Sequence, residues 1–277
     1  MSERVAVAVE GHVATVTLTR PDKHNALDVA MLDAILAAAE RLRGEAGVRA
    51  VVLCGEGPSF CSGLDVVSIM ASAPDRSGPA GRTDDGRAGV AALADRLRGP
   101  VPNWFQRASH DWLTLPMPVI AALHGSVLGG GLQIALGADI RIAAPDARLS
   151  VMEVKWGLIP DMGITRTLPR LVPIDVAKEL TYTGRTVSGE EAAALGLVTR
   201  VSDDPLPAAR ELAERIASRS PDAVRRAKRL YESAWTGDTA HTLALEAELQ
   251  LELIGSPNQL AAVAAGFSGE PAEFTDP

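Results

Sequence analysis

Cysteine is nearly absent from this sequence: Cys54 and Cys61 are the two cysteines among 277 residues. A secreted framework of disulfides is therefore not expected, and neither cysteine belongs to a CxxC pair or a Cys/His cluster of the kind that binds zinc. Aromatic residues are also scarce, at 4%, so alanine, valine, leucine and isoleucine must fill the core. We expect no metal site and a reducing, cytoplasmic setting.

Basic residues are also fewer than acidic ones: 27 lysines and arginines stand against 35 aspartates and glutamates, which gives a formal net charge of -8. A general nucleic-acid-binding protein needs a basic surface that neutralises phosphates, so we expect no nucleic-acid partner. The first residues lack the charged start and apolar run of a signal peptide. No apolar stretch approaches transmembrane length without a charge or a glycine, so we expect no membrane partner.

What is present is an alternation of strands and helices over residues 1–204. Alternating apolar residues and threonines at residues 14–19, preceded by a Gly11–His12 turn, predict a hairpin. Leucine and isoleucine on one face predict a helix over residues 28–43. Short, mainly apolar runs predict buried strands at residues 50–53, 119–123 and 140–143. This order indicates βαβ units and an α/β fold class.

The rest of the chain, residues 205–277, predicts helices and no further strands. The helical stretches are residues 206–218, 221–235 and 239–254. The third has a broader apolar surface than packing on its own core requires, which indicates a subunit interface. The polar residues 266–277 predict a frayed end. Earlier in the chain, residues 72–87 are rich in Gly, Pro, Ser, Asp and Arg and predict a mobile loop or insertion.

Three consecutive glycines, Gly129 to Gly131, separate a strand from an apolar helix within residues 118–143. Glycine lets a ligand approach the backbone closely. The free N–H groups of the new helix, with the positive end of its dipole behind them, suit a developing negative oxygen. Tight packing of helix on strand, or a phosphate site, would also explain the glycines.

A second turn between strand and helix has the sequence SFCSGLD, Ser59 to Asp65. It again exposes N–H groups, although an ordinary glycine-containing turn is the preferred explanation for this segment taken alone.

Two carboxylates, Glu153 and Asp161, stand in the apolar stretch VMEVKWGLIPDMG. A carboxylate among such residues is partly desolvated, which raises its pKa and makes it a better base. The alternative is a surface acid paired with Lys155 or Arg166, and the spacing favours neither interpretation.

These three segments, in this order, resemble the crotonase superfamily, the enoyl-CoA hydratase/isomerase family. RPDKHNAL at residues 20–27 and LTYTGRTVSGEEAAALGLVTRVS at residues 180–202 extend the match over residues 5–202. The resemblance implies a crotonase-like spiral of ββα units, with residues 205–277 as a helical region that packs homotrimers, often paired as hexamers. It also implies an enzyme that acts on an acyl-CoA thioester and needs no separate cofactor, because coenzyme A enters with the substrate.

By motif position, the resemblance implies that the backbone N–H groups of Cys61 and Gly130 form the oxyanion hole. Each such donor contributes roughly 2.7–4 kcal/mol to an oxyanion-like transition state. The substrate-binding residues implied in the same way are Lys23, Ala26, Ser62, Gly63, Leu64, Asp65 and Gly129.

The chain departs from the hydratases of this family at one catalytic position. Those enzymes hold a water between two glutamates; Glu153 matches the second, but Gln133 stands at the first. An amide can hydrogen-bond a water but cannot exchange a catalytic proton as a carboxylate does. An isomerase that removes a proton at one carbon and returns it at another needs only one glutamate.

Features of the dienoyl-CoA isomerase branch are also present. SGLD resembles that branch's first oxyanion segment, and Asp161 matches its second acidic position, eight residues after Glu153. That branch has an aspartate where this chain has Gln133. Our hypothesis is an isomerase of enoyl- or dienoyl-CoA, with Glu153 as principal base, Asp161 as second base and Gln133 beside them.

Other functions stay open. A hydratase that adds water to 2-enoyl-CoA, a CoA-thioester-binding protein with reduced catalysis, and a decarboxylase or thioesterase of the same family all fit the resemblance. The fold architecture also resembles that of Clp-type serine proteases, but the nearness of His124 and Ser126 in sequence does not give triad geometry, and no GxSxG is present. Trp104, Phe105 and Trp112 line either an acyl pocket or the core.

Overall fold

A hairpin opens the fold of the computed structural model, which describes residues 4–65, 68 and 95–277. β1 (Val5–Glu10) and β2 (Val13–Leu18) pair antiparallel around the expected turn, where Gly11 has a φ of +56°. The loop expected at residues 72–87 lies outside the described residues.

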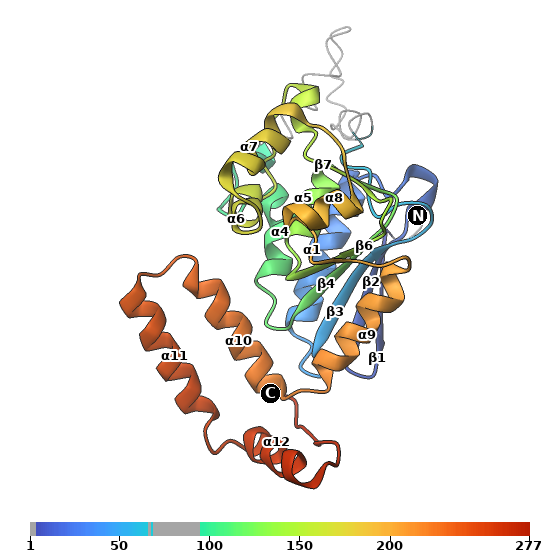
Figure 1. The fold of residues 1–277 in the computed structure, drawn as a ribbon. Helices are drawn as coiled ribbons and strands as arrows, with labels where there is room; N and C mark the ends of the chain where they lie inside the picture. Colours follow the sequence, from blue (N-terminus) through green and yellow to red (C-terminus); the bar gives the residue numbers. More distant parts are fainter. Residues whose placement is uncertain (1–3, 66–67, 69–94) are drawn as a thin grey trace, which may run out of the picture.

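The hairpin begins a six-stranded sheet of order β1-β2-β3-β4-β6-β9, in which every pairing after the hairpin is parallel (Figure 1). The remaining strands are β3 (Ala50–Gly55), β4 (Val119–Leu123), β6 (Ile140–Ala143) and β9 (Arg200–Val201). The central strands β3 and β4 are apolar, and β6 is apolar except for the buried Arg141, because both faces of the sheet are covered. In β3, Val51 and Leu53 face one side, whereas Val52 and Cys54 face the other.

Helices α1 (Val29–Arg43), α4 (Trp104–Leu113) and α5 (Gly130–Leu136) pack on the first face of the sheet. The Asp28 side chain accepts a hydrogen bond from Met31 N–H and begins α1 at the predicted position. Asn103 and Gln106 form a capping box that begins α4. The apolar side chains of these helices and of the sheet form the main core.

Helix α9 (Pro205–Ala217) covers the opposite face through Ala209, Ala213 and Ala217, which pack on β3, β4 and β6. Small alanines allow the helix to lie close to the strands. The division of the chain at residue 204 stays a prediction, but the helix just after it belongs structurally to the core.

A second, three-stranded sheet positions the candidate site. β5 (Ser126–Leu128) pairs in parallel with β7 (Arg148–Ser150), and β7 pairs with β8 (Val187–Ser188). Because Leu128 is in register with Ser150, the glycines after β5 lie beside the segment after β7. That region and its surroundings include η1 (Pro21–Lys23), η2 (Glu153–Trp156), α6 (Ile164–Thr167), η3 (Leu168–Arg170), α7 (Ile174–Thr183) and α8 (Gly189–Leu195).

The last three helices form an arm that extends from the core, which we call the C-terminal arm (Figure 1). It comprises α10 (Pro221–Ala234), α11 (Thr239–Leu253) and α12 (Pro257–Ser268). The buried Lys228 anchors α10, because its ammonium donates to the Trp112 and Met117 carbonyls and pairs with Asp139 at 2.8 Å. None of the helices in the described part of the chain is long and apolar enough to cross a membrane.

The end of the chain returns to the core, so the predicted fraying is wrong. The Arg49 guanidinium donates to Asp276 at 2.6 Å and to the Phe274 carbonyl at 2.9 Å. Asn258 on α12 also holds Thr275 through its backbone N–H at 3.0 Å. A buried arginine requires several acceptors, and the C-terminal residues supply two of them.

Candidate active site

The junction of β5 and α5 has a backbone that only glycine accommodates readily. Gly129 has φ +53° and ψ −123°. A Cβ on Gly130 would lie 2.8 Å from Met162 Sδ and 3.0 Å from Leu27 Cδ1. The Gly130 N–H belongs to the first turn of α5 and has no backbone acceptor among the described residues. The predicted donor at Gly130 therefore has an N–H group available.

Cys61, the other predicted donor, has no free N–H. Its N–H donates to the Ser126 carbonyl at 3.0 Å, within a parallel bridge to Val127. Its thiol is fully buried and donates to the Asn25 carbonyl at 3.1 Å. Burial raises the pKa of this thiol to about 12. The assignment of the Cys61 N–H to the oxyanion hole is therefore wrong: the segment docks on β5 at that residue.

Leu64 has an unused N–H in this turn, whereas the Gly63 N–H faces the Cys61 thiol. The neighbours of Leu64 are paired, since Leu27 N–H donates to the Gly63 carbonyl at 2.8 Å and Asp65 N–H donates to the Leu27 carbonyl at 3.0 Å. Leu64 N–H itself has no acceptor among the described residues. Leu27 pairs with Leu64 and also contacts Gly130, so both unused N–H groups lie next to one residue.

Sequence reasoning placed Leu64 among the substrate-binding residues but missed it as a donor, because strand pairing decides which N–H in a turn stays free. The available signal was Gly63, whose φ is +92° and whose added Cβ would lie 2.8 Å from the Leu128 carbonyl. Gly63 therefore lies against the β5–α5 junction, and Leu64 is the residue that follows it.

Glu153 lies at the start of η2 and is 7% exposed. Its Oε1 accepts a hydrogen bond of 2.6 Å from Gln133 Nε2, whereas its buried Oε2 has no partner among the described residues. Burial raises the pKa of Glu153, the hydrogen bond from Gln133 opposes this, and the nearby Asp161 charge adds to the increase. The result is a desolvated carboxyl with one unengaged oxygen, which suits proton transfer.

Gln133 uses both ends of its amide. While Nε2 donates to Glu153, Oε1 accepts a 2.8 Å hydrogen bond from Met162 N–H. These two contacts fix the orientation of the amide and connect α5 to the turn that contains Asp161. Gln133 therefore holds Glu153 in place without exchanging a proton.

Asp161 is half-buried, and burial raises its pKa. The alternative reading of the two acids as ion-paired surface groups is wrong, because within residues 4–65, 68 and 95–277 neither forms an ion pair with Lys155 or Arg166. Asp161 is close enough to Glu153 for its charge to affect the pKa of that glutamate.

The two segments predicted to bind substrate lie side by side. Ser62 N–H donates to the His24 carbonyl at 2.9 Å, and Ser62 Oγ donates to the Lys23 carbonyl. Lys23 is exposed and Ala26 is half-buried at this edge. The Asp65 carboxylate, in contrast, is occupied. Burial opposes its ionisation, but hydrogen bonds from Ser68 and Arg20 outweigh burial and lower its pKa.

Several sequence alternatives are decided by these contacts. Phe105 and Trp112 are buried in the core, and Trp104 is partly buried and donates to Asp33. The His124 ring bonds the Gly57 carbonyl at 2.9 Å and not Ser126, which removes the support for a hydrolase dyad. In the described part of the chain, no cluster of three or more His, Cys, Asp or Glu could hold a metal.

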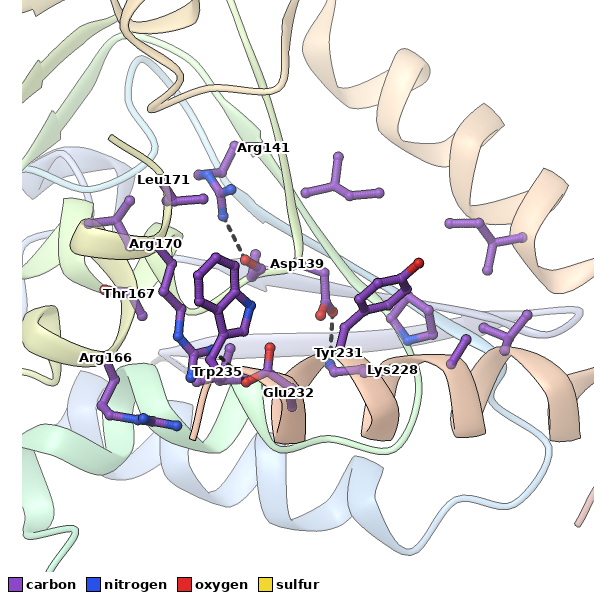
Figure 2. A pocket seen from close by; sticks show the side chains of 18 residues that line it. Asp139, Arg141, Arg166, Thr167, Arg170, Leu171, Lys228, Tyr231, Glu232 and Trp235 are labelled. Carbon is purple, nitrogen blue, oxygen red and sulfur yellow. Dashed lines mark hydrogen bonds and ion pairs between the residues drawn. The ribbon is translucent and has the colours of Figure 1, made fainter. Parts of the chain in front are cut away.

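A separate cavity of about 480 Å³ lies between α10 and the core, as Figure 2 shows. It contains the Lys228–Asp139 pair, and Arg170 extends beside Trp235 to reach Glu232 at 2.8 Å. Neither Glu153 nor Gly130 lines it, so it is distinct from the candidate active site.

Comparison with known proteins matches this geometry to one family. The sequence model of enoyl-CoA hydratase/isomerase matches residues 13–254. This chain belongs to the enoyl-CoA hydratase/isomerase family. Family members act on acyl-CoA substrates, and the α/β core with its C-terminal helices is the crotonase fold that the sequence predicted.

Relatives of both reaction types are similar to this family member. A short-chain-enoyl-CoA hydratase of Clostridium acetobutylicum is 33% identical over 264 residues, which cover 94% of this chain and 93% of the relative. The mitochondrial Delta(3,5)-Delta(2,4)-dienoyl-CoA isomerase of Rattus norvegicus is 37% identical over 225 residues, 80% of this chain and 66% of the relative. A crystal structure of an enoyl-CoA hydratase from Bacillus anthracis has a TM-score of 0.82 at 32% identity and 98% coverage of each chain.

Proposed function

We propose that this protein is an enoyl-CoA isomerase, which moves a proton and a double bond next to a CoA thioester. The observation that carries the proposal is the direct 2.6 Å contact between Gln133 and Glu153. A hydratase of this family would hold a water between two carboxylates. Here an amide occupies the first position and touches the remaining carboxylate, while Oε2 of Glu153 stays unengaged.

The reaction follows from these groups. The thioester oxygen accepts hydrogen bonds from the Leu64 and Gly130 N–H groups. The Glu153 carboxylate removes a proton from C2 of a 3-enoyl-CoA, and the electron pair of the C–H bond moves toward the thioester oxygen, which the two donors stabilise. The protonated Glu153 then returns the proton to C4, and the double bond moves from C3–C4 to C2–C3. One carboxylate serves as base and acid, so no net proton is consumed.

A dienoyl-CoA is the second candidate substrate, favoured by Asp161. This carboxyl is half-buried, has a raised pKa and lies near Glu153. Two carboxyls with raised pKa values could exchange protons at the two ends of a conjugated system. The similarity to dienoyl-CoA isomerases supports this candidate.

Incubation with a 3-enoyl-CoA in heavy water, followed by chromatography and mass spectrometry, tests the proposal. We expect a 2-enoyl-CoA of the same skeleton, and a loss of roughly 10²–10⁴-fold in kcat for Glu153→Gln, the usual contribution of general acid–base catalysis. A hydrated product without accumulated 2-enoyl-CoA would assign the protein to the hydratases. Full activity of Glu153→Gln would remove Glu153 from the mechanism.

The variant Gln133→Glu provides a further prediction, because it restores the second carboxylate. We expect the ratio of hydrated to isomerised product to rise, since a second carboxyl can activate a water. Gln133→Asn is the matched control: it keeps the amide and should not promote hydration. An unchanged product ratio in Gln133→Glu would mean that residue 133 does not select the reaction.

We also propose that the protein assembles into homotrimers, or hexamers built from them, through the C-terminal arm. In support, α11 buries only Leu245 and Leu249 as apolar anchors in this chain. Large apolar side chains are exposed along the arm: Leu243, Leu251, Ile254, Leu260, Val263 and Phe267. The cytoplasmic setting and the independence from a separate cofactor stay predictions.

A further inference from the structure

Arg20, at the start of the RPDKHNAL motif, contacts both segments that meet at Leu64. Its Nη1 donates to the Ala26 carbonyl at 2.9 Å, and its Nη2 donates to Asp65 Oδ2 at 2.9 Å. The side chain is 8% exposed. The guanidinium is therefore buried between two segments that are far apart in sequence.

These contacts surround the bridge that leaves the Leu64 N–H unused. Ala26 precedes Leu27 in one segment, and Asp65 follows Leu64 in the other. Leu27 and Leu64 are paired residues of the bridge. The guanidinium thus joins the two segments immediately beside this pair, and a change in their separation would move the Leu64 N–H.

The backbone of the same motif is fixed independently. The buried Asn25 side chain accepts from Arg20 N–H at 2.8 Å and donates to the Ser59 carbonyl at 2.7 Å and the Glu56 carbonyl at 2.9 Å. The Arg20 side chain consequently starts from a rigid backbone, and its guanidinium holds the Asp65 carboxylate together with Ser68.

We propose that Arg20 is a positioning residue, which sets the direction of the Leu64 N–H toward the thioester oxygen. The inference rests on the proposed function, because it assigns that N–H to the oxyanion hole. A planar guanidinium supplies two fixed donors that reach a carbonyl and a carboxylate together, whereas a lysine ammonium is a single point charge. Arg20→Lys should keep the charge and lose the connection between the segments.

The test is the absorption spectrum of bound cinnamoyl-CoA, whose conjugated thioester shifts to longer wavelength when its carbonyl is polarised. The wild-type protein should shift the band of the bound thioester. Arg20→Lys should bind the probe but lose most of this shift. With the enoyl-CoA substrate, kcat should fall about 10- to 100-fold, with KM changed less than about threefold, because a misdirected donor weakens transition-state stabilisation.

Arg49→Lys is the matched control. Arg49 is also a buried arginine, 7% exposed in its side chain, that donates to a carboxylate and to carbonyls, and it takes no part in the site. Both lysine variants should lower the melting temperature, but Arg49→Lys should keep the spectral shift. A second variant, Asp65→Asn, weakens the Arg20–Asp65 contact by removing the carboxylate charge. It should reduce the spectral shift as well.

The outcomes separate the two proposals. If Arg20→Lys and Asp65→Asn both keep the full spectral shift of the wild type and an unchanged kcat, the proposed role of Arg20 is overturned. The proposed function would still stand. If Arg20→Lys does not fold, Asp65→Asn alone decides between these results. A wild-type protein that binds cinnamoyl-CoA without any shift would overturn the oxyanion site itself, and the role of Arg20 with it.

Discussion

At the scale of single residues, the candidate site depends on one carboxyl held in an unfavourable environment. Glu153 is buried, receives one hydrogen bond from Gln133 and keeps one oxygen without a partner. Ionised carboxylates are most stable in water, so this placement makes Glu153 a stronger base than an exposed glutamate.

The pH dependence of the reaction should report this environment. Activity requires ionised Glu153, so kcat should fall as the pH decreases through the raised pKa, above the value of about 4.3 for an ordinary glutamate. Asp161→Asn removes a negative neighbour of Glu153. It should therefore move the acidic limb of the pH–rate profile, where kcat falls, toward lower pH. Steady-state rates measured between pH 4 and pH 8, on the order of ten points, would check it. A limb that does not move would show that the two carboxyls are not coupled.

The same burial predicts a conflict between stability and activity. A carboxyl whose pKa is raised in the folded state binds more protons when folded, so its contribution to stability falls as the pH rises above the unfolded pKa. Glu153→Gln carries no such charge. Its free energy of unfolding should exceed that of the wild type by an amount that grows above about pH 4.3 and levels off once Glu153 is ionised. Urea unfolding at several pH values measures the difference. A difference that is constant with pH would contradict this account.

At the scale of elements, α10 is attached to the core by a buried cation. Lys228 donates to two carbonyls and to Asp139, and the pKa of Asp139 is raised by burial despite this pairing. Lys228→Ala should therefore cost about 3–5 kcal/mol in the free energy of unfolding, because Asp139 would stay buried without its partner. Chemical denaturation measures this cost.

Arg229→Ala is the control for this prediction. Arg229 lies on the same helix and pairs with Glu248, and the side chains of both residues are exposed. Exposed pairs contribute less than about 1 kcal/mol. Equal losses in the two variants would show that Lys228 is not a special anchor.

The elements also show how far a sequence can predict this fold. The runs at residues 119–123 and 140–143 became β4 and β6 with unchanged bounds, because a strand buried on both faces is mainly apolar; the buried Arg141 is the exception in β6. The short strands β5, β7 and β8 were not predicted, since two or three residues carry no period of their own and depend on their partners. Helix α12 was also missed, although its sequence carries helix signals: Ser256 caps it, Pro257 is its first residue and alanines follow.

Within the site, chemistry was easier to predict than geometry. Glu153, Gln133 and Asp161 could be found because carboxyl and amide groups are visible in the sequence. The choice of Cys61 failed because a backbone N–H is present at every residue, and only pairing with β5 shows which one is used.

At the scale of the whole molecule, the C-terminal arm presents apolar surface that the chain itself does not cover. Leu251 is 72% exposed on α11. If the proposed trimers or hexamers form through this face, Leu251→Glu should shift the protein toward monomers, because a buried, unpaired charge at an interface is costly. Light scattering after size-exclusion chromatography measures the mass. Gln250→Glu adds the same charge at the neighbouring exposed residue and should leave the mass unchanged. An unchanged mass for Leu251→Glu would exclude this face from the interface.

The burial of the two cysteines has a practical consequence for such measurements. Cys61 and Cys54 are both enclosed, and burial raises the pKa of each thiol. Thiol reagents attack the thiolate, so the native protein should react with neither maleimides nor Ellman's reagent, whereas the unfolded chain should titrate as two thiols. A cysteine introduced on the arm would then be the one labelled position, and fluorescent probes could follow subunit assembly on an otherwise native chain.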